Sequence, residues 1–423
     1  MKTKNASVLV AGLALFSMFF GAGNLIFPPH IGLWAGEKFP LAIIGFLLSS
    51  VGLVLASSAA STKAGGSLLT LTGPLGKTFS LVFGTAVILA IGPMLAIPRT
   101  AATTCEILQG TLFAKLNPLL CSVIFFSCVL FFVLSPQNII DLLGKGLTPA
   151  LVLVLALILT KGFSSPLGAP ADTGAKRVFS ESFLEGYQTM DALAAMIFTS
   201  LVGDGLKKKG FTDTSSLVHA SIKAALIAGI GLAAVYGGLL YIGATLSGAE
   251  LCAMDRVSLL IHATEALLGH RGKYALSLAI VLACLTTAIG LTMTVGNFFE
   301  QISSGRLKRV PVCICSTLFS VCLSVKGVEA IVAIAGNVLS LLYPVAMVLI
   351  FLNLFSERFP EKATWQGAVF GALALSALSL LSRLTGSLNL FAWMAALPKT
   401  LSTFLWILPA CFFGHVFPKL KKA

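Results

Sequence analysis

Long stretches without charged residues dominate the hydrophobic pattern of this chain. A membrane-crossing helix needs about 20 mostly apolar residues, and windows of this kind recur from one end of the sequence to the other. The windows expected to cross a membrane are residues 5–36, 39–62, 78–98, 116–140, 146–160, 181–203, 224–249, 274–299, 310–325, 330–356, 363–382 and 400–418. The pattern predicts an all-α polytopic membrane protein with about 12 transmembrane helices.

One polar connection between these windows is amphipathic. In residues 255–268 (DRVSLLIHATEALL), apolar side chains recur at helical spacing at Val257, Leu260, Ile261 and Leu268. The segment therefore predicts an extracellular helix that lies on the bundle. It is either a gate or a surface helix, and the spacing favours neither.

Composition and charge agree with this class of protein. Of 423 residues, 57% are hydrophobic and only 11% are charged, whereas about a quarter of a soluble protein is charged. The net charge of +13 comes from lysine and arginine in short breaks, as is typical of loops that determine topology, so we expect no nucleic acid partner. An even number of spans places both termini on one side, and the bias of basic residues toward that side predicts that both are cytoplasmic.

The chemistry of the polar residues does not indicate an enzyme. No nucleophile–base–acid set, Walker motif or zinc-like cysteine spacing is present, so we expect no cofactor and no ATP-driven step. A passive channel would show a repeated pore-lining motif, and none occurs. Six of the nine cysteines are expected to act as small hydrophobic residues in the apolar windows. These are Cys121, Cys128, Cys284, Cys313, Cys315 and Cys322.

The spacing of the windows repeats. Windows two to five begin at 39, 78, 116 and 146, and windows seven to ten begin at 224, 274, 310 and 330. Because each copy has five spans, an odd number, the second copy is inverted in the membrane, an arrangement common in secondary transporters. We expect one transmembrane domain over residues 1–423, with repeat one at about 5–160, repeat two at about 180–356 and two additional helices at about 363–418.

The first and sixth windows are interrupted by polar or flexible residues. The first carries Gly21-Ala22-Gly23-Asn24, and the sixth is long enough only if it includes Asp191. An acid at membrane depth usually faces a cavity or a partner. Glycines alone also suit close helix packing, but the matching interruption favours two broken helices. The double proline at 28–29 is expected to mark where the second half-helix of this span is redirected.

Broken helices expose backbone groups that can bind ligands: half-helix N-termini attract anions and freed carbonyls coordinate cations. Thr286 and Thr287 in the eighth window either bond back to their own helix or contribute to a sodium site. In the third window, Pro93 and Pro98 are expected to kink or end the helix. We expect Arg99 to extend to the membrane surface there, with pairing to Glu106 as the alternative.

Five motifs carry a resemblance that covers essentially the whole chain. They are FGAGNLIFPP at 20–29, IGPMLAIPRTA at 91–101, EGYQTMDALAA at 185–195, CLTTAIGL at 284–291 and LLYPVAMVLI at 341–350. The sequence resembles the branched-chain amino acid:cation symporter family, within the amino acid–polyamine–organocation superfamily. The resemblance implies Na⁺-coupled import of leucine, isoleucine and valine across the bacterial inner membrane, with a five-plus-five inverted repeat of the leucine-transporter type.

The resemblance also implies roles for individual residues. The expected substrate-binding residues are Gly21, Ala22, Gly23, Asn24, Tyr187, Gln188, Thr189, Met190 and Asp191. The expected sodium ligands are Asn24 at one site, and Thr286 and Thr287 with carbonyls around Ser17, Phe20 and Ala283 at a second. Asp191 is expected to orient the break or to ligate an ion. An H⁺-coupled symporter of other neutral or hydrophobic amino acids, with Asp191 as proton carrier, is the alternative. Nothing in the sequence specifies an oligomeric state.

Overall fold

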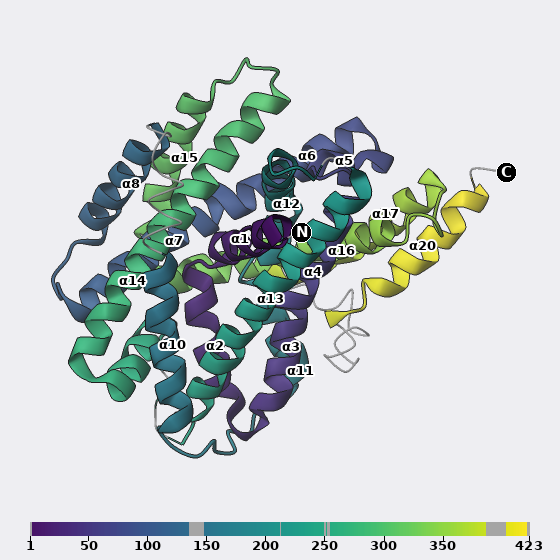
Figure 1. Ribbon diagram of the computed structural model, residues 1–423. Helices are drawn as coiled ribbons and strands as arrows, with labels where there is room; N and C mark the ends of the chain where they lie inside the picture. Colours follow the sequence, from purple (N-terminus) through teal and green to yellow (C-terminus); the bar gives the residue numbers. More distant parts are fainter. Residues whose placement is uncertain are drawn as a thin grey trace.

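The computed structural model describes residues 2–134, 148–211, 213–248, 251, 254–385 and 403–420, and its regular elements in these ranges are all helices (Figure 1). The α-helices are α1 (Lys2–Phe19), α2 (Ala22–Ala35), α3 (Phe39–Leu47), α4 (Leu53–Lys63), α5 (Leu68–Leu71), α6 (Lys77–Leu89), α7 (Ala96–Thr111), α8 (Pro118–Leu134), α10 (Thr148–Ser164), α11 (Val178–Tyr187), α12 (Asp191–Lys208), α13 (Thr214–Ala244), α14 (Arg256–Ile302), α15 (Arg309–Ser324), α16 (Val328–Leu354), α17 (Lys362–Thr385) and α20 (Ile407–Leu420). The π-helical segment Leu48–Gly52 joins α3 to α4. A second one, Ala90–Met94, continues α6 and ends just before α7.

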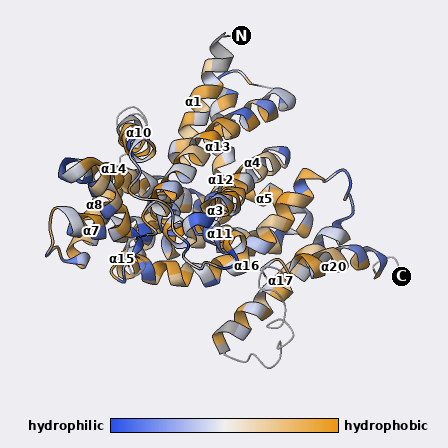
Figure 2. Cartoon of the chain, turned by 90° about the horizontal axis from the view of Figure 1, so that it is seen from below, coloured by the Kyte–Doolittle hydropathy of each residue, from blue (hydrophilic) through white to orange (hydrophobic). Residues whose placement is uncertain are grey.

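Each of the expected windows contains at least part of one of these helices. The parts of the windows at 135–140, 146–147, 249 and 400–402 lie outside the described residues. Several helices are long and apolar enough to cross a membrane, among them α13, α14 and α16. Large apolar side chains such as Ile230 and Leu278 are 71% and 63% exposed, which suits contact with lipid. Figure 2 shows hydrophobic residues along most helices and hydrophilic residues mainly at their ends and connections.

Helices of each repeat pack against helices of the other repeat. The halves of the first interrupted span, α1 and α2, both pack on α13, and the halves of the sixth, α11 and α12, pack on α3 and α4. The third and eighth spans meet through α7 and α14, and the fourth and ninth through α8 and α15. This reciprocal packing is that of a five-plus-five inverted repeat. Helices α17 and α20 pack together beside this bundle, to the right in Figure 1.

The amphipathic connection forms the expected helix. Asp255 caps its N-terminus by accepting hydrogen bonds from the N–H groups of Val257 (3.1 Å) and Ser258 (2.9 Å). Gly269, with φ of +68°, interrupts α14 and separates this segment from the membrane-crossing part. A positive φ is accessible to glycine at little cost, so the chain turns there without a long loop.

The double proline does not end the helix in which it lies. Both prolines lie inside α2, which begins before them at Ala22 and continues to Ala35. Proline removes helical hydrogen bonds, but membrane helices tolerate it when neighbouring helices pack around it. Here Gly32 and Gly243 let the backbones of α2 and α13 approach so closely that a Cβ atom on either glycine would clash with a carbonyl.

One cysteine expected to act as a small hydrophobic residue forms a disulfide. Cys121 in α8 is bonded to Cys105 in α7. The connection between these helices spans only residues 112–117, so the end of one helix lies beside the start of the next. Cys284 and Cys313 are buried free thiols, as expected.

The contact between α2 and α13 generates the first prediction. Gly243→Ala should lower the melting temperature of the detergent-purified protein by several degrees, because the new Cβ would clash with the Pro29 carbonyl and overpacking costs about 1–3 kcal/mol. Gly237→Ala on the same helix is the control, since its Cβ would meet no heavy atom within 4 Å and alanine is the better helix former. Equal melting temperatures for the two variants would contradict this packing.

Candidate functional site

The first span is interrupted between α1 and α2, as expected. Gly21 adopts an extended conformation, with φ −120° and ψ −170°. The Asn24 side chain accepts a hydrogen bond from the Gly21 N–H through Oδ1 (3.2 Å) and so caps the start of its own helix. The other side of the break faces α14, where the Thr287 hydroxyl donates to the Phe20 carbonyl (3.4 Å).

The sixth span is interrupted between α11 and α12, again as expected. Met190 immediately precedes α12 in the left-handed conformation, with φ of +62°, which costs a non-glycine residue about 1–2 kcal/mol. The Thr189 hydroxyl donates to the Gly186 carbonyl (2.9 Å) and satisfies one group that the interruption frees. Strain of this kind often occurs at functional sites.

A buried hydrogen-bond triad ties the two interruptions together. Asn24 Nδ2 and the Tyr236 hydroxyl each donate to Asp191 Oδ2 (both 2.8 Å), and Asn24 Nδ2 also donates to the Tyr236 hydroxyl oxygen. Asn24, Tyr236 and Asp191 are only 2%, 0% and 3% exposed, respectively. The triad links α2, α12 and α13, and it gives the acid the partners that an intramembrane carboxylate requires.

Arg99 does not extend to the membrane surface, and it does not pair with Glu106. It is 3% exposed, and its Nη1 donates to the Gln188 carbonyl (2.6 Å), while Glu106 accepts from the Val328 N–H (2.8 Å). The expectation was wrong because the third span does not end at Pro98. After the non-helical Gly92, the chain resumes its helix as α7 and reaches Thr111, which places Arg99 well inside the span.

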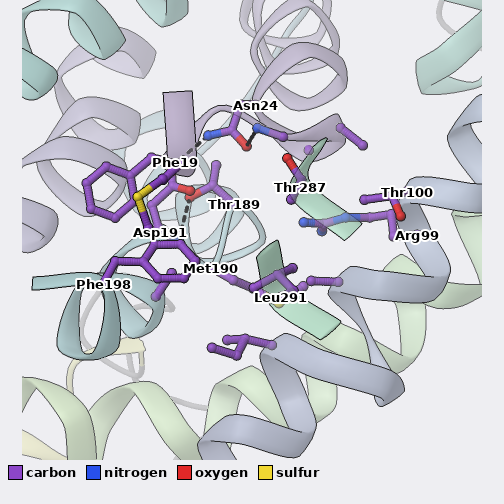
Figure 3. A pocket seen from close by; sticks show the side chains of 17 residues that line it. Phe19, Asn24, Arg99, Thr100, Thr189, Met190, Asp191, Phe198, Thr287 and Leu291 are labelled. Atoms are coloured by element: carbon purple, nitrogen blue, oxygen red, sulfur yellow. Dashed lines mark hydrogen bonds between the residues drawn. The ribbon is translucent and has the colours of Figure 1, made fainter. Parts of the chain in front are cut away.

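A cavity lies where the two interruptions, α7 and α14 meet (Figure 3). Its polar lining side chains are Asn24, Arg99, Thr100, Thr189, Asp191 and Thr287, and its apolar ones include Met18, Phe19, Ile91, Met190, Phe198 and Leu291. The helices α2 and α12 both begin at this cavity. It therefore combines two positive helix ends, one basic and one acidic side chain, and an apolar wall.

Most of the expected substrate-binding residues line this cavity. They are Gly21, Ala22, Gly23, Asn24, Thr189, Met190 and Asp191. Tyr187 and Gln188 are not among the lining residues. The Tyr187 ring stacks on Tyr343 with centroids 4.0 Å apart, and Gln188 Nε2 donates to the Val332 carbonyl (3.4 Å).

The expected sodium ligands of the eighth span lie beside the first interruption. The Thr286 hydroxyl donates to the Ala283 carbonyl of its own helix (2.8 Å), whereas Thr287 reaches across to Phe20. Ser17 lies in α1, which ends just before Phe20. Thr286 thus bonds back to its own helix, as one of the two interpretations expects, and Thr287 bridges two helices. Hydroxyl and carbonyl oxygens together suit a hard cation.

A second arginine, Arg256, contacts the same aromatic ring as Arg99. Arg256, at the start of the amphipathic helix, forms ion pairs with Glu185 of α11 (2.7 Å) and with Glu329 of α16. The Phe27 ring contacts the guanidinium groups of both Arg99 (5.3 Å) and Arg256 (5.5 Å). The amphipathic helix is therefore tied to an interrupted span by charge and is more than a loosely attached surface helix.

The sequence reasoning missed two residues of this site. For Arg99 a signal existed, because an arginine inside a membrane span is costly and usually functional. For Tyr236 there was none, because its apolar window shows nothing that would bring it to a carboxylate 45 residues away.

Comparisons with known proteins agree with this architecture. A family described as "Branched-chain amino acid transport protein" matches residues 4–422. A branched-chain amino acid transport system 2 carrier protein of Pseudomonas aeruginosa is 34% identical, covering 96% of this chain and 94% of the relative. The branched-chain amino acid permease BraB of Bacillus subtilis is 36% identical, covering 84% and 81%.

Two solved structures show the same fold at low sequence identity. One is Mhp1, a nucleobase-cation-symport-1 family transporter, in a closed conformation with bromovinylhydantoin bound. It has a TM-score of 0.67 and 15% identity, covering 98% of this chain and 92% of Mhp1. The other is MhsT in complex with L-phenylalanine, with a TM-score of 0.56 and 17% identity, covering 96% of each chain. The fold is of the leucine-transporter type, and the chain is a membrane transporter that belongs to the branched-chain amino acid transport protein family.

Proposed function

We propose that this protein imports leucine, isoleucine and valine across a bacterial inner membrane by symport with sodium and alternating access. The observation that carries the proposal is the meeting of two interrupted helices at one cavity with a polar end and an apolar wall. A membrane-depth site on discontinuous helices is the arrangement by which secondary transporters bind both substrate and ion.

The cavity matches the chemistry of a branched-chain amino acid. The backbone around Gly21, Ala22 and Gly23 begins α2 and provides N–H groups and a positive helix end for the carboxylate. Thr189 and Asp191, on the other side, offer oxygen atoms to the ammonium group. Phe19, Met190 and Phe198 supply an apolar wall for the aliphatic side chain. Because leucine and valine differ by one methylene, we expect only modest discrimination between them, worth about 1–3 kcal/mol.

Sodium is the coupling ion that the neutral oxygen atoms favour. Thr286, Thr287 and the carbonyls of Phe20 and Ala283 cluster where α1 ends against α14, and Ser17 adds a further oxygen in α1. Asn24 is a candidate ligand for a second ion, because its carbonyl oxygen has another lone pair besides the one facing the Gly21 N–H.

The alternative coupling ion is a proton carried by Asp191. Oδ2 of this carboxylate already accepts two hydrogen bonds, from the buried side chains of Asn24 and Tyr236. Protonation would weaken bonds that hold the two interruptions together. We therefore propose that Asp191 orients the breaks, and that sodium drives transport.

The disulfide supports the proposed orientation of the chain. With both termini in the cytoplasm, the connection between α7 and α8 lies on the outer side, where disulfides persist. Cys105 and Cys121 are bonded at that connection, in agreement with the bias of basic residues toward the terminus side.

Uptake by the purified protein in liposomes tests the function. An inward Na⁺ gradient should concentrate labelled leucine, isoleucine and valine inside the vesicles, and replacing Na⁺ by choline should abolish this. Uptake driven equally well by a proton gradient without Na⁺ would instead support the proton-coupled alternative. Absence of uptake under both gradients would contradict the proposal.

The threonine of the proposed sodium site gives a sharper prediction. Thr287→Val keeps the shape of the side chain but removes the hydroxyl that faces Phe20, so the Na⁺ concentration for half-maximal leucine uptake should rise at least about tenfold, which corresponds to the 1.4 kcal/mol or so of one lost ligand. Thr294→Val on the same helix is the control, because that hydroxyl is exposed and bonds only to its own helix, at the Gly290 carbonyl (2.8 Å). Equal Na⁺ dependence of the two variants would remove Thr287 from the ion site.

The triad gives a stability prediction. Tyr236→Phe deletes a donor to a buried carboxylate, so the free energy of unfolding should fall by about 1–3 kcal/mol and the melting temperature of the purified protein should drop. The matched control is Tyr241→Phe on the same helix, where the ring packs against Phe39 and Phe163 and these contacts survive the change. A melting temperature unaffected by Tyr236→Phe would show that the triad does not hold the interruptions together.

A further inference from the structure

We propose that Arg99 binds the α-carboxylate of the substrate and thereby selects free amino acids over their amides and amines. This assignment rests on the proposed function and deepens it, because it moves the main carboxylate recognition from backbone alone to a side chain of the third span. The sequence motif IGPMLAIPRTA at 91–101 then has a role in the site.

The Arg99 guanidinium is buried with few partners. Its side chain lines the cavity, is 3% exposed and donates one described hydrogen bond, from Nη1 to the Gln188 carbonyl. Its buried Nε has no hydrogen-bond partner in the structure. A guanidinium offers five N–H donors in a planar fork, and so the geometry leaves donor capacity for an anion.

The Arg99 guanidinium lies close to the N-terminus of α2, so both could bind the same substrate carboxylate. A Cβ atom at Gly23 would lie 2.7 Å from Nη2 and 3.0 Å from Cζ of Arg99, so the glycine permits this close approach to the first turn of α2. Figure 3 shows Arg99 extending from its helix into the cavity, toward Thr287. An amino acid carboxylate placed there would receive hydrogen bonds from α2 backbone N–H groups and from the arginine fork.

Asp191 is the nearby acid, but it does not bond to Arg99 directly. It lies near enough for the two charges to attract each other, yet among the described ion pairs none joins them. The Oδ2 atom of Asp191 is engaged by donors from α2 and α13. The described contacts of the Arg99 guanidinium are a neutral carbonyl and the Phe27 ring. A buried arginine without a directly bonded anion is costly, and the substrate carboxylate would supply a negative charge in direct contact with the guanidinium.

Direct binding of matched ligands to the purified full-length protein in Na⁺ buffer tests the assignment. Leucine and leucinamide share the ammonium group and side chain, but only leucine carries a carboxylate. The wild type should bind leucine at least about 30-fold more tightly than leucinamide, because a buried charge pair loses this much or more when one partner is removed. In Arg99→Gln the affinity for leucine should fall by a similar factor, while that for leucinamide should change less than about threefold, so that the ratio collapses.

Two further variants make the measurement specific. Arg256→Gln is the matched control. Like Arg99, Arg256 contacts the Phe27 ring, but it does not line the cavity, so the ratio of affinities should stay at the wild-type value. Arg99→Lys keeps the charge but loses the fork and should give an intermediate ratio. If Arg99→Gln does not fold, the ratios in the wild type and in Arg99→Lys decide the question.

The outcomes separate this assignment from the proposed function. A wild type that binds leucine and leucinamide equally, or an Arg99→Gln protein that loses both ligands in parallel, would overturn the assignment while leaving branched-chain transport intact. Ratios that collapse as described, in a protein that shows no Na⁺-driven uptake, would support the assignment and overturn the sodium coupling.

Discussion

The structure depends on how two interrupted helices satisfy their polar groups inside a membrane. Each freed N–H or C=O group costs several kcal/mol in lipid unless it finds a partner. Asn24 accepts from the Gly21 N–H, and Thr287 donates to the Phe20 carbonyl from α14. The side-chain bonds of Asn24 and Tyr236 to Asp191 then link both interruptions to α13. Interruptions that would destabilise an isolated helix thereby hold backbone groups in fixed orientations for binding.

This constraint accounts for the shape and chemistry of the cavity. Because α2 and α12 begin at the same place, their positive ends converge, and the carbonyl ends of α1 and α11 lie nearby. An amino acid carries one negative and one positive group on the same carbon, so it suits a site with both kinds of helix end. The close packing of α2 on α13 through Gly32 and Gly243 keeps this geometry in place despite the two prolines.

Much of the fold could be predicted from sequence, since charge-free windows and their doubled spacing identify the helices and the inverted repeat. The polar interruptions at Asn24 and Asp191 were likewise visible, because polar residues at membrane depth are rare. Arg99 was misplaced because a hydrophobic window ends at its first charge, whereas the real helix continues along a buried polar face. Tyr236 and the disulfide of Cys105 could not be foreseen, because both depend on which helices lie side by side.

The central claim is that substrate and ion bind where the two interruptions meet. An experimental structure of the protein with leucine and Na⁺ tests it most directly. The account predicts leucine in the cavity, with its carboxylate between the start of α2 and Arg99 and its side chain against Phe19 and Phe198, and an ion beside Thr287. Leucine bound at a site that none of these residues lines would contradict the account.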